Sequence, residues 1–109
     1  RLNEILTTLN EREDTIIIVL NIPDLRYLPA FSSANPDALD ATVRDWNMAI
    51  AEVSDRYGAT LVDLYGSSLE LDVHPEYISA DGFHPSSTGY RRIADLVLSA
   101  IETNAPALR

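Results

Sequence analysis

The segment that most limits the possible folds is TIIIVLNI, residues 15–22. It is continuously apolar from Ile16 to Leu20 and rich in β-branched side chains, which pack well in strands. A strand without polar alternation is covered on both faces, as in parallel sheets whose crossover helices lie on either side. The run therefore predicts an α/β fold built on a parallel sheet.

Three helical patterns and a second apolar segment accompany this strand. The first pattern, residues 2–12, has one apolar face, and ATLVDLY, residues 59–65, is a second short buried strand. A long helix should begin at Pro36, capped by Asn35, and end before Gly58. Its apolar positions, spaced by three and four, are Leu39, Val43, Trp46, Ile50, Val53 and Tyr57. The last helix should bury Tyr90, Ile93, Ala94, Val97 and Ile101.

The order helix, strand, helix, strand, helix is that of a right-handed parallel unit. It predicts part of a flavodoxin-like, three-layer α/β/α fold, with two strands and three helices in this chain. A two-stranded parallel sheet is hardly a complete domain, so one strand edge should lack its neighbour. We therefore expect residues 1–109 to be the C-terminal segment of a single larger domain.

Composition narrows the possible functions. The chain has 8 basic and 17 acidic residues and a net charge of −9, which disfavours nucleic acid and anionic membrane surfaces as partners. It has no cysteine, which excludes disulfides, thiolate zinc sites and a cysteine nucleophile. No apolar run reaches the length of about 18 residues that a membrane span requires.

The loop SADGFHPSSTGYRRIA, residues 79–94, has the pattern of an acid–base pair. Pro85 restricts His84 to extended backbone geometry, and Ser86 or Ser87 can cap the helix that follows. Asp81 can accept a hydrogen bond from one ring nitrogen of His84, which leaves the other free to take a proton. The loop follows the second strand, and in open α/β sheets sites lie beyond the carboxyl ends of strands. The pair fits a general base with its orienting acid.

The same residues allow two other interpretations. Asp81 can simply stabilise a turn beside a surface histidine. Alternatively, His74, Asp81 and His84 together offer two imidazoles and a carboxylate to a metal ion, as in a metal-dependent hydrolase. His74, which precedes Pro75, is more typical of a surface loop residue.

The segment DGFHPSSTGYRRIADLVLSAI, residues 81–101, resembles the last sequence block of the SGNH hydrolases, also called the GDSL lipase/esterase family. Asp81, His84, Pro85, Gly89 and Tyr90 match that block. Residues 2–31 are similar to the family's preceding helix, buried strand and proline-containing loop. The resemblance covers essentially the whole chain. It implies a serine esterase or lipase in which Asp81 orients His84 and His84 takes the serine proton. It also implies small-molecule, carbohydrate or lipid esters as substrates and no cofactor. It does not decide the cellular compartment, and export from the cytoplasm is compatible with it.

The departures from the family pattern are equally informative. The chain has neither the family's Gly-Asp-Ser block nor its Gly-x-Asn-Asp block. The nucleophilic serine and the oxyanion donors are therefore expected upstream of Arg1, and this chain should be inactive without that half. A non-catalytic carbohydrate-binding or scaffold module on the same fold is the alternative.

Several other side chains receive structural assignments. Asn21 should cap a loop, Trp46 should lie in the core, and Arg91 and Arg92 should face solvent. The apolar residues of the loop 24–35 should either pack that loop or form the wall of an acyl or alcohol pocket; these are Leu25, Tyr27, Leu28 and Phe31.

Overall fold

The computed structural model describes residues 1–10 and 15–104. Its elements follow one another as α1 (Leu2–Asn10), β1 (Ile18–Leu20), α2 (Pro36–Arg56), β2 (Thr60–Val62), α3 (Leu69–Val73) and α4 (Ser87–Asn104). Short 3-10 turns lie at η1 (Leu25–Tyr27), η2 (Pro29–Phe31) and η3 (Pro75–Tyr77). The predicted first helix ends at Asn10, and residues 11 and 12 lie outside the described part.

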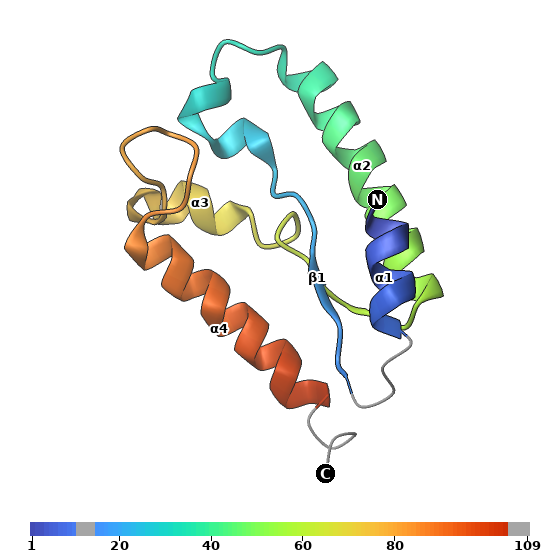
Figure 1. Cartoon of the computed structure of the whole chain (residues 1–109). Helices are drawn as coiled ribbons and strands as arrows, with labels where there is room; N and C mark the ends of the chain where they lie inside the picture. The colour runs from blue at the N-terminus through green and yellow to red at the C-terminus, as the bar shows by residue number, and fades with distance from the viewer. Residues whose placement is uncertain (11–14, 105–109) are drawn as a thin grey trace.

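β1 and β2 form a parallel two-stranded sheet, which confirms the α/β fold class. Ile18 pairs with Thr60, and Leu20 pairs with Val62. One more backbone bond continues the ladder beyond β1, from the Asn21 N–H to the Val62 carbonyl oxygen at 3.2 Å. The strands are shorter than the apolar runs that predicted them. Figure 1 shows α4 on one side of β1 and α2 on the other, so that helices flank both faces.

The ends of α2 form as the sequence predicts. The Asn35 side chain accepts a hydrogen bond from the Ala38 N–H at 3.0 Å, and Pro36 occupies the first turn. Gly58 follows the helix with φ of +69°, a conformation that glycine adopts without steric cost. Both capping predictions are therefore confirmed, because each rests on contacts within a few residues.

The buried faces of α2 and α4 are narrower than predicted. Val43 is almost fully buried, but Trp46 is 53% exposed and is not a core residue. Tyr90 and Ile101, expected in the buried stripe of α4, are 56% and 40% exposed. Helical spacing identifies an apolar face correctly, whereas a two-stranded sheet covers only part of such a face.

The two long loops contain more regular structure than predicted. The loop after β1 forms η1 and η2, and the segment between β2 and α4 forms η3 and a fourth helix, α3. With five residues, α3 is too short for apolar periodicity to reveal it.

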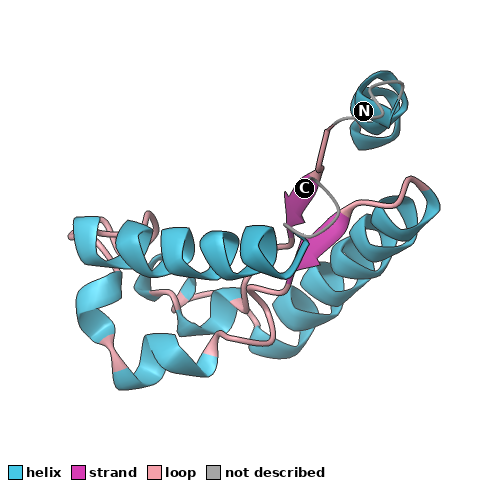
Figure 2. Cartoon of the chain, turned by 90° about the horizontal axis from the view of Figure 1, so that it is seen from below, coloured by secondary structure: helices cyan, strands magenta, loops and turns pink. Residues whose placement is uncertain are grey.

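The core is small. Its buried apolar side chains are Leu6, Leu28, Val43 and Val62, and the buried polar residues are Asn21, Asp24, Ser54 and Ser68. α1, marked by N in Figure 2, lies at the edge of the molecule and contacts α2. None of the described helices combines the length and the hydropathy needed to cross a bilayer.

Candidate active site

The turn that holds Asp81 and His84 connects η3 to α4. Figure 1 places this turn at the same end of the molecule as the loop that follows β1. The Ser79 N–H donates to the His84 carbonyl oxygen at 2.9 Å, and the Gly82 N–H donates to the Ser79 carbonyl oxygen at 3.0 Å. Gly82 has φ of +72°, which side-chain-bearing residues rarely adopt. The turn is therefore closed by its own backbone.

The Asp81 carboxylate is the hydrogen-bonding centre of the turn. Its Oδ1 accepts from the Ser79 hydroxyl at 2.7 Å and from the backbone N–H groups of Phe83 and His84 at 2.8 and 2.9 Å. Its Oδ2 lies 2.5 Å from His84 Nδ1. The bond to His84, followed by those from Phe83 and Ser79, holds the pKa of Asp81 well below its usual range. Asp81 therefore stays ionised and available to bind the imidazole.

The imidazole of His84 is held at one nitrogen and open at the other. Its side chain is 61% exposed, and within residues 1–10 and 15–104 no group bonds Nε2. When Nδ1 donates to Asp81, Nε2 carries the lone pair that accepts a proton. The arrangement is chemically competent as a general base with an orienting carboxylate.

The start of α4 fixes the chain directly after His84. The Ser86 hydroxyl accepts from the Gly89 N–H at 3.1 Å, so Ser86, and not Ser87, is the capping residue. Gly89 is packed so closely that a Cβ there would clash with the carbonyl oxygen of Tyr77. This glycine, which belongs to the family-like block, therefore allows α4 to approach η3.

The loop after β1 contacts the turn that holds Asp81 and His84. The Ala30 N–H donates to the Gly82 carbonyl oxygen at 3.0 Å. The rings of Phe31 and Phe83 meet edge to face with 5.8 Å between centroids, and the Phe83 ring meets the His84 ring in the same way at 4.6 Å. His84 is thus joined through Phe83 to a segment about fifty residues earlier in the sequence.

An apolar cleft of about 570 Å³ opens beside His84. Three of the four predicted pocket-wall residues line it, Leu25, Leu28 and Phe31, but Tyr27 does not. Its other lining residues include Leu39 and Trp46 of α2, Ile78, Phe83, and Ile93 and Leu96 of α4. Trp46 therefore faces the cleft, which explains its exposure.

Arg92 was expected to face solvent, and this is wrong. It forms a bidentate ion pair with Glu70 of α3, with its Nη2 2.8 Å and its Nε 3.1 Å from the two carboxylate oxygens. Both residues line the cleft, and the pair lowers the pKa of Glu70. No sequence pattern indicates this contact, because α3 is too short to show apolar periodicity.

His74 lies apart from the Asp81–His84 pair. Its Nδ1 is 3.0 Å from the Glu76 carboxylate, and its ring stacks on Tyr77 at 4.8 Å. In the part of the chain that the structure describes, no three His, Asp or Glu residues are grouped to hold a metal ion. The metal site of His74, Asp81 and His84 is therefore not formed here, because His74 has its own local partners.

Asn21 has the structural role expected for it. It is 8% exposed, its Nδ2 donates to Asp63 at 2.8 Å, and its Oδ1 accepts from the Tyr65 N–H at 3.0 Å. These bonds join the end of β1 to the residues that follow β2.

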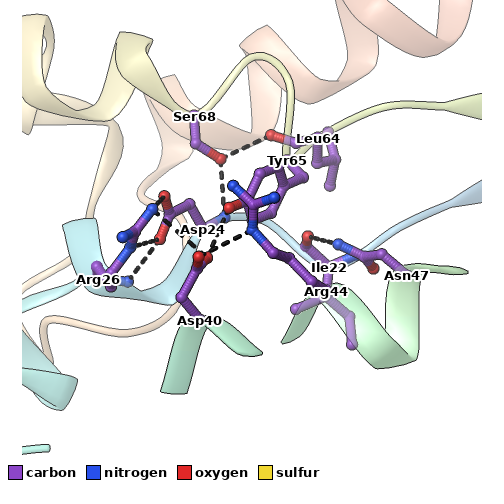
Figure 3. A network of polar contacts seen from close by, with 9 residues as sticks. All are labelled: Ile22, Asp24, Arg26, Asp40, Arg44, Asn47, Leu64, Tyr65 and Ser68. Carbon is purple, nitrogen blue, oxygen red and sulfur yellow. Dashed lines mark hydrogen bonds and ion pairs between the residues drawn. The ribbon is translucent and has the colours of Figure 1, made fainter. Parts of the chain in front are cut away.

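Sequence reasoning missed a cluster of charged side chains at the carboxyl ends of the strands (Figure 3). Tyr65 donates its hydroxyl to Asp40 at 2.6 Å, and Arg44 donates to the same carboxylate at 2.9 Å. Arg26 lies 3.4 Å from Asp40 and forms a bidentate pair with Asp24, at 2.9 and 2.7 Å. We call Asp24, Arg26, Asp40, Arg44 and Tyr65 the Asp40 cluster.

The Asp40 cluster is balanced in charge. Arg26 lowers the pKa of Asp24, and the Tyr65 hydroxyl, followed by Arg44, lowers the pKa of Asp40. The same bond to Asp40 raises the pKa of Tyr65. Only the i,i+4 spacing of Asp40 and Arg44 was visible in the sequence.

Residues 1–92 match the model of a protein family described as the GDSL-like lipase/acylhydrolase family. No curated protein and no solved structure matches the chain.

Proposed function

The chain belongs to the GDSL-like lipase/acylhydrolase family, and from this premise we propose that it supplies the catalytic Asp81–His84 pair of a serine ester hydrolase. The observation that carries the proposal is the 2.5 Å contact between Asp81 Oδ2 and His84 Nδ1, which leaves Nε2 free at the edge of an apolar cleft. The role of general base requires this geometry.

In the proposed reaction, His84 Nε2 takes the proton of a serine hydroxyl while the serine oxygen attacks the ester carbonyl carbon. Collapse of the tetrahedral intermediate breaks the bond to the alcohol, which leaves with the proton from His84. His84 then takes a proton from water while the water oxygen attacks the carbonyl carbon of the acyl-serine. Collapse of this second tetrahedral intermediate breaks the bond to the serine oxygen, which takes the proton back from His84 as the carboxylic acid leaves. Asp81 holds Nδ1–H throughout and stabilises the imidazolium that forms twice. The cycle requires no metal and no organic cofactor.

We further propose that the serine and its oxyanion donors lie upstream of Arg1, so that residues 1–109 form the C-terminal segment of one domain. Two observations support this proposal. β1 is paired along one edge only in the described sheet, and its Leu20 is 38% exposed. A strand contributed by the upstream half would pair with that edge and cover Leu20. The chain alone would then be inactive.

The cleft supports small-molecule, carbohydrate or lipid esters with an apolar portion as substrates. Leu25, Leu28 and Phe31, which belong to the loop after β1, line the cleft together with His84. Because the lining is mostly apolar, an acyl chain or an apolar alcohol gains by leaving water there.

A fluorophosphonate that reacts only with activated serines tests the proposal. The complete protein is expected to be labelled and to hydrolyse p-nitrophenyl acetate, whereas the separate 1–109 chain should do neither. His84→Ala should abolish both reactions, and His74→Ala, which removes the other histidine, should leave both unchanged. If the complete protein is neither labelled nor active, the esterase is ruled out in favour of a carbohydrate-binding or scaffold module.

A further inference from the structure

We propose that the Asp40 cluster and residues 24–31 position the imidazole of His84. This inference rests on the proposed function, since it assigns positioning residues to that general base. None of the cluster residues is a catalytic group. They would act through the contacts that join the loop after β1 to the Asp81–His84 turn.

The first step is the anchoring of the loop. Asp24 is 5% exposed, its backbone N–H donates to the Ser68 hydroxyl at 2.8 Å, and Ser68 in turn donates to the Leu64 carbonyl oxygen. Its carboxylate binds Arg26, which reaches Asp40 on α2, as Figure 3 shows. The start of the loop is therefore fixed both to α2 and to the segment after β2.

The two carboxylates are the shielded members of the cluster, because the side chains of Asp24 and Asp40 are 7% and 13% exposed. A shielded carboxylate that loses its partner is left without compensation, so these pairs fix the local geometry. Asp40 receives bonds from Tyr65 and Arg44 in addition to its contact with Arg26. One carboxylate of α2 thus binds groups from two segments distant in sequence, the loop after β1 and the residues after β2. A displacement of Asp40 would therefore move Arg26 and, with it, the loop after β1.

The second step is the short path from the cluster to the turn. Two consecutive 3-10 turns, η1 and η2, occupy residues 25–27 and 29–31, and Leu28 between them is 6% exposed. The Ala30 N–H then bonds the Gly82 carbonyl oxygen. A Cβ on Gly82 would lie 3.0 Å from Pro29 Cβ and 3.1 Å from the Ala30 nitrogen, so the loop and the turn are in tight contact. Movement of the loop therefore displaces the turn.

The third step concerns the imidazole itself. Asp81 holds His84 at Nδ1 alone, and a ring held at one atom can still tilt about that bond. The Phe83 ring limits this tilt from the side at 4.6 Å, and Phe31 supports Phe83 at 5.8 Å. The direction of Nε2 therefore depends on Phe31, and the position of Phe31 depends on the anchored loop.

The test uses Asp40→Asn in the complete protein, with Glu52→Gln as the matched control. Glu52 also lies on α2 and forms an i,i+4 pair with Arg56, but that pair is exposed and far from the cluster. We expect Asp40→Asn to lower kcat for p-nitrophenyl acetate roughly tenfold while KM changes less than about twofold, because misplacement affects the chemical step. Glu52→Gln should change neither constant.

Phe31 provides a second variant that leaves the cluster intact. Phe31→Ala should lower kcat about threefold to tenfold, the range for losing an aromatic contact, and Phe31→Tyr, which keeps the ring, should restore it. The double variant Asp40→Asn/Phe31→Ala should be no slower than the slower single variant, since both act through one route. Independent, multiplying losses would overturn the proposal.

Nitrogen chemical shifts of the His84 ring give a measurement that does not depend on turnover. The folded wild type should show one tautomer with Nδ1 protonated. In Asp40→Asn and in Phe31→Ala the ring shifts should move, because a tilted ring changes the geometry of its hydrogen bond to Asp81. If folded Asp40→Asn has unchanged kcat and unchanged ring shifts, the proposal is wrong. If Asp40→Asn does not fold, the same two measurements on Phe31→Ala decide. If the complete protein lacks esterase activity, the proposed function fails, whereas the ring shifts still decide whether the cluster positions His84.

Discussion

Two loops at the carboxyl ends of the strands are each centred on an aspartate, and the two aspartates differ in almost every other respect. The Asp81 side chain is 50% exposed, and its four partner groups belong to residues 79, 83 and 84. The Asp24 side chain is 7% exposed, and its loop is held by groups from α2 and from the segment after β2. The exposed carboxylate is built from local contacts and presents a reactive group. The Asp24 carboxylate binds Arg26, two residues away, and distant groups reach its loop through the Asp24 backbone N–H and the Arg26 side chain, which contact Ser68 and Asp40.

The largest expected effect comes from removing the reactive group. His84→Ala should lower kcat/KM for a simple acetate ester at least about a thousandfold, because no other group takes the serine proton. The fold should survive, since the His84 side chain is exposed. Thermal unfolding and ester hydrolysis measure the two properties. Near-wild-type turnover by this variant would refute the role assigned to His84.

Asp81→Asn should have the next largest effect, a loss of roughly a hundredfold to ten-thousandfold in kcat. The amide can still accept the bonds that close the turn, but its NH₂ group does not accept from His84 Nδ1–H, so the reactive tautomer is lost. Glu76→Gln is the matched control, because Glu76 contacts His74 at 3.0 Å in an equivalent exposed pair. Equal losses in both variants would show that the two pairs are not functionally distinct.

Gly82→Ala tests the contact between the two loops. Gly58 is its control, since both glycines have positive φ but only Gly82 has neighbours within contact distance of an added Cβ. Gly58→Ala should lower the free energy of unfolding by about 1–2 kcal/mol, the conformational cost alone. Gly82→Ala should lower it further, and only this variant should reduce kcat. Equal stability losses with unchanged kcat would mean that the close approach to Pro29 has no consequence.

The smallest effect is a difference in acid sensitivity at Asp24. Because Arg26 lowers the pKa of Asp24 below 3.8, the carboxylate stabilises the folded state above that pH. This stabilisation is lost as the pH falls through the lower, folded-state pKa. Asp24→Asn should therefore be less stable than the wild type at pH 7, by about 1–3 kcal/mol, and the difference should shrink below pH 3.8. Urea unfolding at several pH values measures it, and a constant difference would contradict the assigned cause.

Sequence patterns were informative wherever the decisive contacts were local. The Asn35 cap, the left-handed Gly58 and the Ser86 cap each depend on residues within four positions. The proline after His84 and the aspartate three residues before it sufficed to predict the bond between the two side chains. The run of residues 15–22 predicts β1, Ile18–Leu20, because continuous apolar character is typical of a strand covered on both faces.

The wrong predictions share one physical cause. A sequence pattern identifies the apolar or polar face of a helix, but it does not show which groups of the folded chain pack against that face. The helical spacing predicts Trp46 in the core, whereas the extent of the sheet decides how much of α2 is covered. The sequence predicts a solvent-facing Arg92, because its partner, Glu70, lies on a helix too short to show periodicity.

The sequence by itself determined the parallel strands, the capped helices and the Asp81–His84 pair, because these depend on side-chain type and on bonds spanning a few residues. Tertiary structure alone decided how the loop after β1 reaches the turn and how Asp24, Asp40 and Tyr65 meet. The bonds between Asp24 and Ser68 and between Tyr65 and Asp40 join residues 44 and 25 positions apart. Local preference carries no information over such distances, because the path of the whole chain sets which groups become neighbours.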